Sequence, residues 1–592
     1  MKQVITQTFF PEGRLHPDLA GALNDCRRSF WSVAAFSGAV NVLMLVGPLY
    51  MLQVYDRVLA SRSIPTLIGL TILMIGAYLF QGLFDFIRSR IVVRVAALID
   101  RDLETAVHSS IVKIALQSRR AGVALQPLRD LDQIRSFLNS GGPIAIVDMP
   151  WMPLYLAICF LIHPLLGVVA LVGGIMLFSL AVFSERNSRE TARILAQGSG
   201  LRSASVEADS RNCETLVAMG MIGVMAQRWS AINGRYLTAL GRSTDLASGF
   251  GSLSKALRMM LQSTMLGTGA YLVIHQELSA GAMVAASIML GRALAPIETA
   301  IANWRGFVSA RQSLKRLSEV LSHFLPEART LELPRPKASI QVSQLWVSPP
   351  MGQDAIVRGV SFHLAAGEVL GIIGPSGAGK TSLLRTLVGI WQPARGTIRI
   401  DGATLDQWDQ RLLGPAIGYA SQPAELFDGT IADNIARMAT DYPSEHVLKA
   451  AQAAGAHEMI LRLPQGYNTP VGESGLALSS GQRQRISLAR ALYDDPFLIV
   501  LDEPHANLDS DGEHALTDAI LGAKARGAIV ILIAHRPSEL ATCDKVLVLT
   551  NGTQHAFGAR DEVLRHMAPQ TVPVPLKRGP AAREKRLAEV RS

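Results

Sequence analysis

The chain has 592 residues, of which 49% are hydrophobic and only 18% charged, with a formal net charge of +9. Because soluble domains usually carry about 25% charged residues, this composition favours a membrane protein and excludes a disordered or collagen-like chain. The cysteines are widely spaced and form no CxxC pair, which excludes a zinc site or a disulfide framework and predicts thiols that pack in the interior. They are Cys26, Cys159, Cys213 and Cys543.

The N-terminal half contains long stretches without Asp, Glu, Lys or Arg. Two of them, residues 30–55 and 63–84, each meet the roughly 20 residues that a helix needs to cross a bilayer. A third stretch, residues 149–184, is too long for one crossing, and His163 and Pro164 interrupt it near its centre. The sequence therefore predicts four membrane helices here, the last two joined by a tight turn.

Ionisable residues lie within the remaining predicted spans or at their edges. The third span must begin near Gly142, which places Asp148 inside the membrane or at its edge. Residues 255–275 and 278–302 predict a fifth and a sixth span, and the sixth contains Arg292. Charged groups at this depth are costly unless they face protein or water.

Basic residues on the flanks of the spans predict the orientation. Arg27 and Arg28 precede the first span, Arg88 and Arg90 follow the second, and Arg186 follows the fourth. Because Lys and Arg are enriched in cytoplasmic flanks, the N-terminus is expected inside the cell. Six crossings would return the chain to the cytoplasm.

The pattern changes after the sixth span. A segment punctuated by prolines marks a linker, and short β-rich runs then alternate with helices, as in an α/β domain. The expected fold class is thus an all-α membrane domain with six spans followed by an α/β domain. The expected boundaries are 1–28 for a short cytoplasmic N-terminus, 29–322 for the membrane domain with long cytoplasmic helical extensions, 323–338 for the linker, 339–566 for the α/β domain and 567–592 for a basic tail.

A phosphate-binding motif follows a predicted buried strand at residues 369–373. The sequence GPSGAGKT matches GxxxxGK[ST] and leads into an apolar helix. Backbone N–H groups and the helix N-terminus would surround a phosphate, Lys380 would reach the β- and γ-phosphate oxygens, and the Thr381 hydroxyl can bind Mg²⁺. The predicted nucleotide-binding residues are Gly374, Pro375, Ser376, Gly377, Ala378, Gly379, Lys380, Thr381 and Ser382.

A second buried strand, residues 497–501, ends in Asp502 and Glu503. A carboxylate at the carboxyl end of such a strand can hold Mg²⁺, which suits Asp502, and the next acid can polarise an attacking water, which suits Glu503. The alternative is that Asp-Glu-Pro only opens a turn, but the phosphate loop upstream favours ATP hydrolysis. His535 follows another predicted strand and by itself would be read as structural.

Residues 478–485, with the sequence LSSGQRQR, resemble the LSGGQ signature of ABC transporters and precede the acidic strand. The resemblance implies a P-loop ABC nucleotide-binding domain that takes ATP and Mg²⁺. It also implies that Gln422 is the Q-loop glutamine, with a role in catalysis and at Mg²⁺. Asp509 would be the D-loop acid at the nucleotide, and His535 the switch histidine at the γ-phosphate.

The signature motif implies a homodimer, because in this family it completes the ATP site of a second copy. Ser479, Gly481 and Gln482 would contact that nucleotide. Ser480 replaces the usual first glycine, which implies slower or altered turnover. Trp346 is a candidate to stack on adenine, and the alternative is that it only packs in its strand.

Runs in the membrane half are similar to bacterial type I secretion exporters of the protease/lipase kind. They are GPLYMLQVYDRVL at 47–59, DMPWMP at 148–153 and HPLL at 163–166. The resemblance implies a multi-pass protein of the bacterial inner membrane, surrounded by lipid, that exports unfolded proteins with C-terminal signals. It further implies a periplasmic membrane-fusion adaptor and an outer-membrane channel as partners. The net charge needs no nucleic-acid partner.

Several interpretations stay open at this point. By resemblance, residues 126–132 and 207–220 are coupling helices that press on the nucleotide-binding domain near Gln422. Asp148 and Arg292 either line the cargo path, or they lie in helix interfaces or are flanking residues that snorkel to the membrane surface. An exporter of lipid or of a small amphiphile would share the architecture, whereas a soluble ABC ATPase acting on DNA or ribosomes cannot accommodate the predicted spans.

Overall fold

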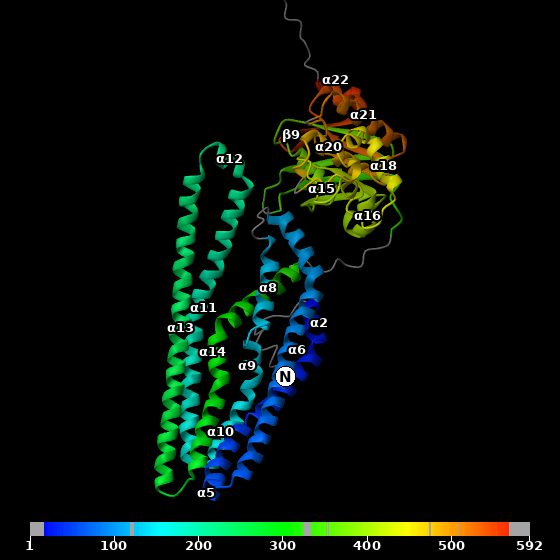
Figure 1. Cartoon of the computed structure of the whole chain (residues 1–592). Coiled ribbons are helices and arrows are strands. Elements are labelled where there is room, and N and C mark those ends of the chain that lie inside the picture. Colours follow the sequence, from blue (N-terminus) through cyan, green and yellow to red (C-terminus); the bar gives the residue numbers. More distant parts are fainter. Residues whose placement is uncertain are drawn as a thin grey trace, which may run out of the picture. The chain divides into compact units, whose positions relative to one another are not determined.

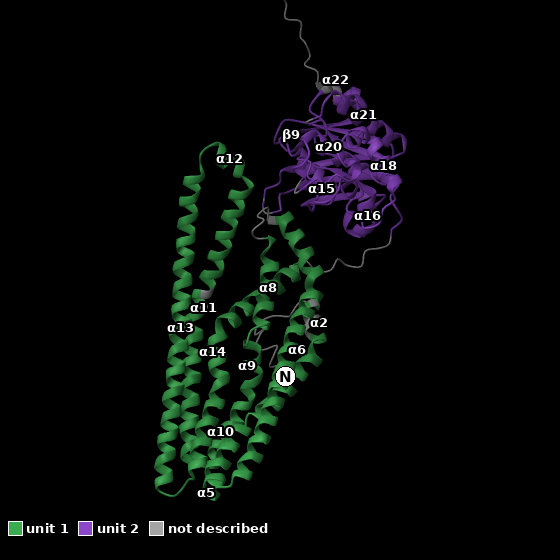
Figure 2. Cartoon of the chain, viewed as in Figure 1, with its two compact units in different colours: residues 1–326 green, residues 327–592 purple. Residues whose placement is uncertain are grey.

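The computed structural model describes residues 17–118, 124–323, 333–350, 352, 354–472, 475–506 and 508–567. The chain divides into two compact units, Met1–Pro326 and Glu327–Ser592 (Figure 2). This boundary lies within the predicted linker 323–338. Linker residues 324–332 and the tail beyond residue 567 are outside the described residues.

The first unit is helical throughout its described residues, and its long helices pack along one another (Figure 1). A short π-helical segment, η1 (Val54–Val58), links the helices on either side of it without a break. The helices are α2 (Pro17–Asp25), α3 (Arg27–Leu43), α4 (Val46–Gln53), α5 (Leu59–Ser61), α6 (Ile64–Ser118), α8 (Gln126–Leu138), α9 (Gly142–Asp148), α10 (Met152–Ile162), α11 (Pro164–Arg211), α12 (Cys213–Ala218), α13 (Ile222–Ile274) and α14 (Ala280–His323).

In the described part of the chain, five helical stretches are long and apolar enough to cross a membrane. They overlap five of the six predicted spans, with bounds that differ by at most two residues at the start of the second and sixth. The remaining span, residues 255–275, lies in α13, where Arg258, Gln262 and Thr264 lower the mean hydropathy. The five stretches are Arg27–Ser61, Ile64–Gln117, Gly142–Ile162, Pro164–Arg211 and Ala280–His323.

Prolines determine where two of these helices break. Pro48 has no N–H, and its ring clashes with the carbonyl four residues earlier, so the helix is interrupted between Leu43 and Val46. At the predicted tight turn, His163 is extended, with φ −162° and ψ 135°. Its Nδ1 accepts a hydrogen bond from the Leu165 N–H at 3.2 Å, and α11 begins at Pro164 as expected.

Asp148 of α9 contacts polar side chains of two other helices. Arg88 Nη1 donates to its Oδ1 at 2.8 Å, Asn41 Nδ2 donates to the same atom at 3.0 Å, and the Ser37 hydroxyl contacts it as well. Arg88 is 4% exposed. This network joins α3, α6 and α9, which favours the helix-interface interpretation of Asp148.

Two further basic residues of the span region differ in their surroundings. Arg258 Nε of α13 lies 2.9 Å from Glu298 Oε2 of α14, so this ion pair connects neighbouring helices. Arg292 is exposed, and its Nη1 lies 4.0 Å from Met44 Sδ. An ion pair between helices satisfies each charge within the protein, which reduces the cost of placing it at membrane depth.

The second unit is built on a ten-stranded sheet with the order β5-β4-β1-β2-β10-β9-β3-β8-β7-β6. Its strands are β1 (Ser339–Val347), β2 (Val357–Ala365), β3 (Val369–Ile373), β4 (Arg395–Ile400), β5 (Ala403–Thr404), β6 (Ile417–Ala420), β7 (Leu498–Leu501), β8 (Ile529–Ile533), β9 (Lys545–Thr550) and β10 (Thr553–Ala559). Its helices are α15 (Lys380–Leu387), α16 (Gln410–Ala416), α17 (Ile431–Ile435), α18 (Ser444–Ala453), α19 (His457–Leu461), α20 (Ser480–Leu492), α21 (Ser510–Ala525) and α22 (Arg560–Met567).

Four neighbouring parallel strands bring the predicted motifs to one edge of this sheet. In the register, β6 Ala420 pairs with β7 Leu501, and β7 Leu501 pairs with β8 Leu532. On the other side of β8, Ile533 pairs with Ile372 of β3. Because the carboxyl ends of parallel strands meet at the same edge, the loops after β3, β6, β7 and β8 all begin there.

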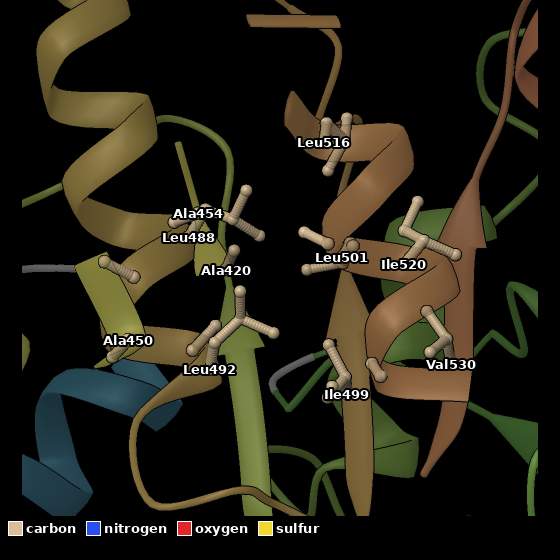
Figure 3. Close-up of a cluster of buried hydrophobic side chains, with 14 of the residues drawn as sticks. Ala420, Ala450, Ala454, Leu488, Leu492, Ile499, Leu501, Leu516, Ile520 and Val530 are labelled. Atoms are coloured by element: carbon tan, nitrogen blue, oxygen red, sulfur yellow. The ribbon is translucent and has the colours of Figure 1, made fainter. Parts of the chain in front are cut away.

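Apolar side chains between this part of the sheet and its helices hold the strands in register (Figure 3). Leu488 of α20 and Ile520 of α21 pack toward Ile499 and Leu501 of β7. Among the cysteines, Cys26, Cys159 and Cys543 are buried as predicted. The prediction is wrong for Cys213, which is exposed because it opens α12 at the end of the α11–α13 hairpin (Figure 1).

Candidate nucleotide-binding site

The loop between β3 and α15 has the conformation that a phosphate loop needs. Gly374 has φ +155°, and a Cβ there would lie 2.1 Å from the Leu549 carbonyl oxygen, so only glycine fits. Lys380 Nζ donates to the carbonyl oxygens of Gly374 at 2.8 Å and Pro375 at 3.1 Å. The lysine thus closes the loop that it belongs to.

Lys380 is held in a buried place beside two acids. It is 6% exposed, and burial lowers the pKa of its ammonium, whereas the charges of Glu503 and Asp502 act in the opposite direction. A phosphate would add further negative charge at this position and would favour the ammonium form. The residues of the loop therefore fit the binding of a nucleotide phosphate.

The side-chain oxygens of Asp502 and Thr381 lie together beside the phosphate loop. The Thr381 hydroxyl donates to Asp502 Oδ1 at 3.1 Å, and the Asp502 backbone N–H donates to the Ala420 carbonyl at 3.0 Å. Asp502 is 1% exposed, and burial is the main cause that raises its pKa. A hydroxyl and a carboxylate suit Mg²⁺, which usually takes only one or two carboxylates from a protein and completes its shell with phosphate and water.

Glu503 and His535 face each other from the ends of β7 and β8. His535 Nε2 lies 2.8 Å from Glu503 Oε1, within hydrogen-bonding distance, and both side chains are partly exposed. Glu503 has φ +51°, an uncommon conformation for a residue with a side chain, and such strain clusters at functional sites. The pair gives His535 the specific partner that the sequence did not identify.

The signature residues form the first turn of α20. The Ser479 N–H donates to Gln482 Oε1 at 2.8 Å, and the Gln482 N–H donates to Ser479 Oγ at 3.3 Å, a reciprocal capping box. Ser480 and Gly481 are the first two residues of the helix, and Ser480 is exposed there. The N-terminus of a 13-residue helix is a favourable position for an anion.

Asp509 connects the signature helix to the loop that follows the acidic strand. Its Oδ1 accepts a hydrogen bond from the Gly512 N–H at 2.9 Å and is ion-paired with Arg485 of α20. The Gly512 amide and then the Arg485 guanidinium lower the pKa of Asp509. Arg485 was not among the predicted residues, because its role depends on a partner from a different element.

The remaining predictions are placed as follows. Gln422 is exposed in the loop directly after β6, and the neighbouring strand β7 ends just before Asp502. Trp346 packs in its strand: the Arg395 guanidinium of the neighbouring β4 lies 5.7 Å from the centre of its ring. Glu539 was missed, although its buried carboxylate accepts hydrogen bonds from the backbone N–H groups of His535 and Arg536. Pro537 at the start of η6 and Glu539 at its third position are the sequence signal that could have predicted a helix start here.

A helical membrane unit joined to an α/β unit with a phosphate loop, an acidic strand end and a signature helix is the architecture of an ATP-driven membrane transporter. Residues 357–506 match the family described as ABC transporter, and residues 31–293 match the ABC transporter transmembrane region. The structure of a bacterial Atm1-family ABC exporter with ATP bound has the same fold, with a TM-score of 0.82 and 24% identity over 92% of this chain and 97% of that one.

Curated relatives cover nearly the whole chain. The type I secretion system ATP-binding protein PrsD of Rhizobium meliloti (strain 1021) is 49% identical over 94% of this chain and 96% of its own length. The toxin RTX-I translocation ATP-binding protein of Actinobacillus pleuropneumoniae is 30% identical over 91% of this chain and 76% of its own length. The chain therefore belongs to the ABC transporters, in the group of type I secretion ATP-binding proteins. It is a multi-pass membrane protein that couples ATP hydrolysis to transport.

Proposed function

We propose that this protein exports unfolded proteins with C-terminal signals from the cytoplasm through the bacterial inner membrane. The observation that carries the proposal is the 49% identity to a type I secretion ATP-binding protein along 94% of the chain. Similarity to a toxin translocation protein supports a protein as cargo. A periplasmic membrane-fusion adaptor and an outer-membrane channel would continue the path.

The basic flanks support the proposed orientation, with the N-terminus and the nucleotide-binding unit in the cytoplasm. Exposed apolar side chains on α6, such as Ile72 and Leu79, support contact with lipid. At the far end of the α11–α13 hairpin, Val217 and Met219 are exposed, which supports α12 as a coupling helix. Apolar side chains exposed together mark a surface that another part of the assembly covers.

In the proposed reaction, the phosphate loop and Lys380 bind and orient ATP. Thr381 and Asp502 would hold Mg²⁺, together with Gln422, and the ion would neutralise charge on the phosphates when bound. Glu503 would take up a proton from the attacking water, and His535 would orient Glu503 and contact the γ-phosphate. Two copies would pair head to tail, so that Ser479, Gly481 and Gln482 of one copy, with Asp509, complete the site of the other.

The test uses the full-length protein with its adaptor and channel in cells. Lys380→Ala is expected to abolish secretion and ATP hydrolysis, and Glu503→Gln is expected to trap an ATP-bound dimer that turns over at least about 100-fold more slowly. Glu458→Gln, an exposed position on α19, is the matched control and should behave as wild type.

Normal secretion by cells that carry Lys380→Ala would contradict the proposal. A protein whose ATP hydrolysis is stimulated by lipid but not by C-terminal cargo peptides would instead be an exporter of lipid or of a small amphiphile. Secretion is measured as the cargo that the cells release. Stimulation of ATP hydrolysis is measured on protein that is purified from the same cells and placed in lipid vesicles.

A further inference from the structure

A buried carboxylate lies one turn after His535, in the short 3-10 helix η6 (Pro537–Thr542). Glu539 Oε2 accepts hydrogen bonds from the backbone N–H of His535 at 2.6 Å and of Arg536 at 3.2 Å. Glu539 is 8% exposed. Hydrogen bonds from amides to an ionised carboxylate are short and about twice as strong as those between neutral groups, so this contact holds the loop firmly.

The same loop has a second contact, an ion pair between Arg536 and a residue of α21. Arg536 Nη1 lies 3.1 Å from Glu513 Oε1 of α21, but both side chains are exposed, so solvent weakens this ion pair. The buried Glu539 contact is therefore the stronger of the two. It fixes the backbone of His535, whose side chain reaches Glu503.

We propose that Glu539 is a positioning residue for ATP hydrolysis: it holds the backbone of His535 so that the imidazole stays in hydrogen-bonding distance of Glu503. This inference rests on the proposed roles of His535 and Glu503. The hydrogen bonds of Glu539 go to backbone N–H groups and not to the His535 imidazole or the Glu503 carboxylate. Its effect on turnover should pass entirely through His535.

The first test compares steady-state ATP hydrolysis by the full-length protein in lipid vesicles. Glu539→Ala removes both hydrogen bonds and is expected to lower kcat by about 10- to 100-fold, because a small displacement of a catalytic group has effects of that size. KM for ATP should stay within about twofold, since the phosphate loop is unchanged. Glu539→Gln keeps an acceptor oxygen of the same reach and should restore kcat to within about threefold of wild type. Glu562→Ala, an exposed acid on α22, is the matched control.

A double-mutant cycle separates positioning from general stability. In a His535→Ala background, Glu539→Ala should lower kcat by less than about twofold, because the group that it positions is gone. If the two single effects multiply instead, the proposal is wrong. It is equally wrong if Glu539→Gln is as slow as Glu539→Ala, or if KM rises while kcat is unchanged.

A folding defect would not prevent a decision. If Glu539→Ala does not fold, Glu539→Asp replaces it, because this variant keeps the carboxylate but shortens the side chain by one methylene. We then expect a lower kcat at an unchanged KM. An unchanged kcat overturns the proposal. Failure of the proposed function shows differently, because Lys380→Ala would then leave secretion intact whatever the Glu539 variants do.

Discussion

At the scale of single residues, Asp502 shows how the site retains a charge that the fold disfavours. Its carboxylate is almost completely buried, and burial raises its pKa above the ordinary value of 3.8. The Thr381 hydroxyl and the Lys380 ammonium oppose this effect without removing it. A cation held by Asp502 and Thr381 would supply a positive charge that offsets the same cost.

Asp502→Asn should therefore make the nucleotide-free protein more stable while it abolishes hydrolysis. Because the folded-state pKa is raised, ionisation of Asp502 destabilises the fold, and this loss of stability develops as the pH rises through that pKa. The variant should melt at a higher temperature than wild type at neutral pH, and the difference should shrink as the pH falls toward 3.8.

The test measures the melting temperature of the nucleotide-free protein from neutral pH down toward pH 3.8. Asp441→Asn, an exposed acid, is the control and should show no such gain. A variant that melts below wild type at neutral pH would contradict the account of Asp502.

At the scale of elements, the membrane unit uses a buried ion pair to connect its helices. Arg88 of α6 and Asp148 of α9 are 5% and 15% exposed at their side chains. Asn41 of α3 donates to Asp148 and accepts from the Tyr155 hydroxyl of α10 at 3.1 Å. Four helices thus meet in one polar network, and Arg88 Nη2 also lies 2.6 Å from Oδ1 of Asp85, an exposed acid on its own helix.

Arg88→Ala should leave the Asp148 carboxylate buried without its main partner. Removal of one member of a buried pair typically lowers the free energy of unfolding by about 3 to 5 kcal/mol. The double variant Arg88→Ala/Asp148→Ala should recover part of this loss, because no charge is then stranded.

Unfolding in detergent micelles measures both effects. Arg94→Ala, which removes an exposed arginine from the same helix, is the matched control. If Arg88→Ala were no more destabilising than Arg94→Ala, the network would not hold these helices together.

At the scale of the whole molecule, one chain carries both a phosphate loop and a signature helix. In the proposed head-to-tail dimer, each site takes Lys380 from one copy and Gly481 from the other. A heterodimer with Lys380→Ala in one chain and Gly481→Asp in the other then has both defects in one site and one intact site. A heterodimer with both substitutions in the same chain has a defect in each site.

The first heterodimer should retain up to about half of the wild-type hydrolysis and the second almost none, because closed symmetric dimers have two equivalent sites. The two chains are co-expressed with different affinity tags, and purification through both tags in turn isolates the heterodimer. ATP hydrolysis is then assayed in lipid vesicles. The reverse order of activities would mean that each site is built from a single chain, and the dimer proposal would be wrong.

Much of the fold could be predicted because its signals are local. The tight turn at His163 and the helix start near Gly142 follow from proline placement and from stretches free of charge. The first predicted span, residues 30–55, lies within one apolar helical stretch, Arg27–Ser61, although a short turn separates α3 from α4 inside it. The burial of Cys213 was predicted wrongly, because exposure depends on the end of a hairpin that the sequence does not mark.

By itself, the sequence determined which chemistry the chain carries, since the phosphate loop, the acidic strand end and the signature turn are each specified within a few consecutive residues. Only the tertiary structure decided how these parts meet. Thr381 contacts Asp502 across 121 positions, Arg88 contacts Asp148 across 60, and Glu503 contacts His535 across 32. Such contacts depend on strand order and helix packing. Glu539 lies only four residues from His535, but its hydrogen bond to the His535 backbone N–H depends on how the loop folds at the start of η6.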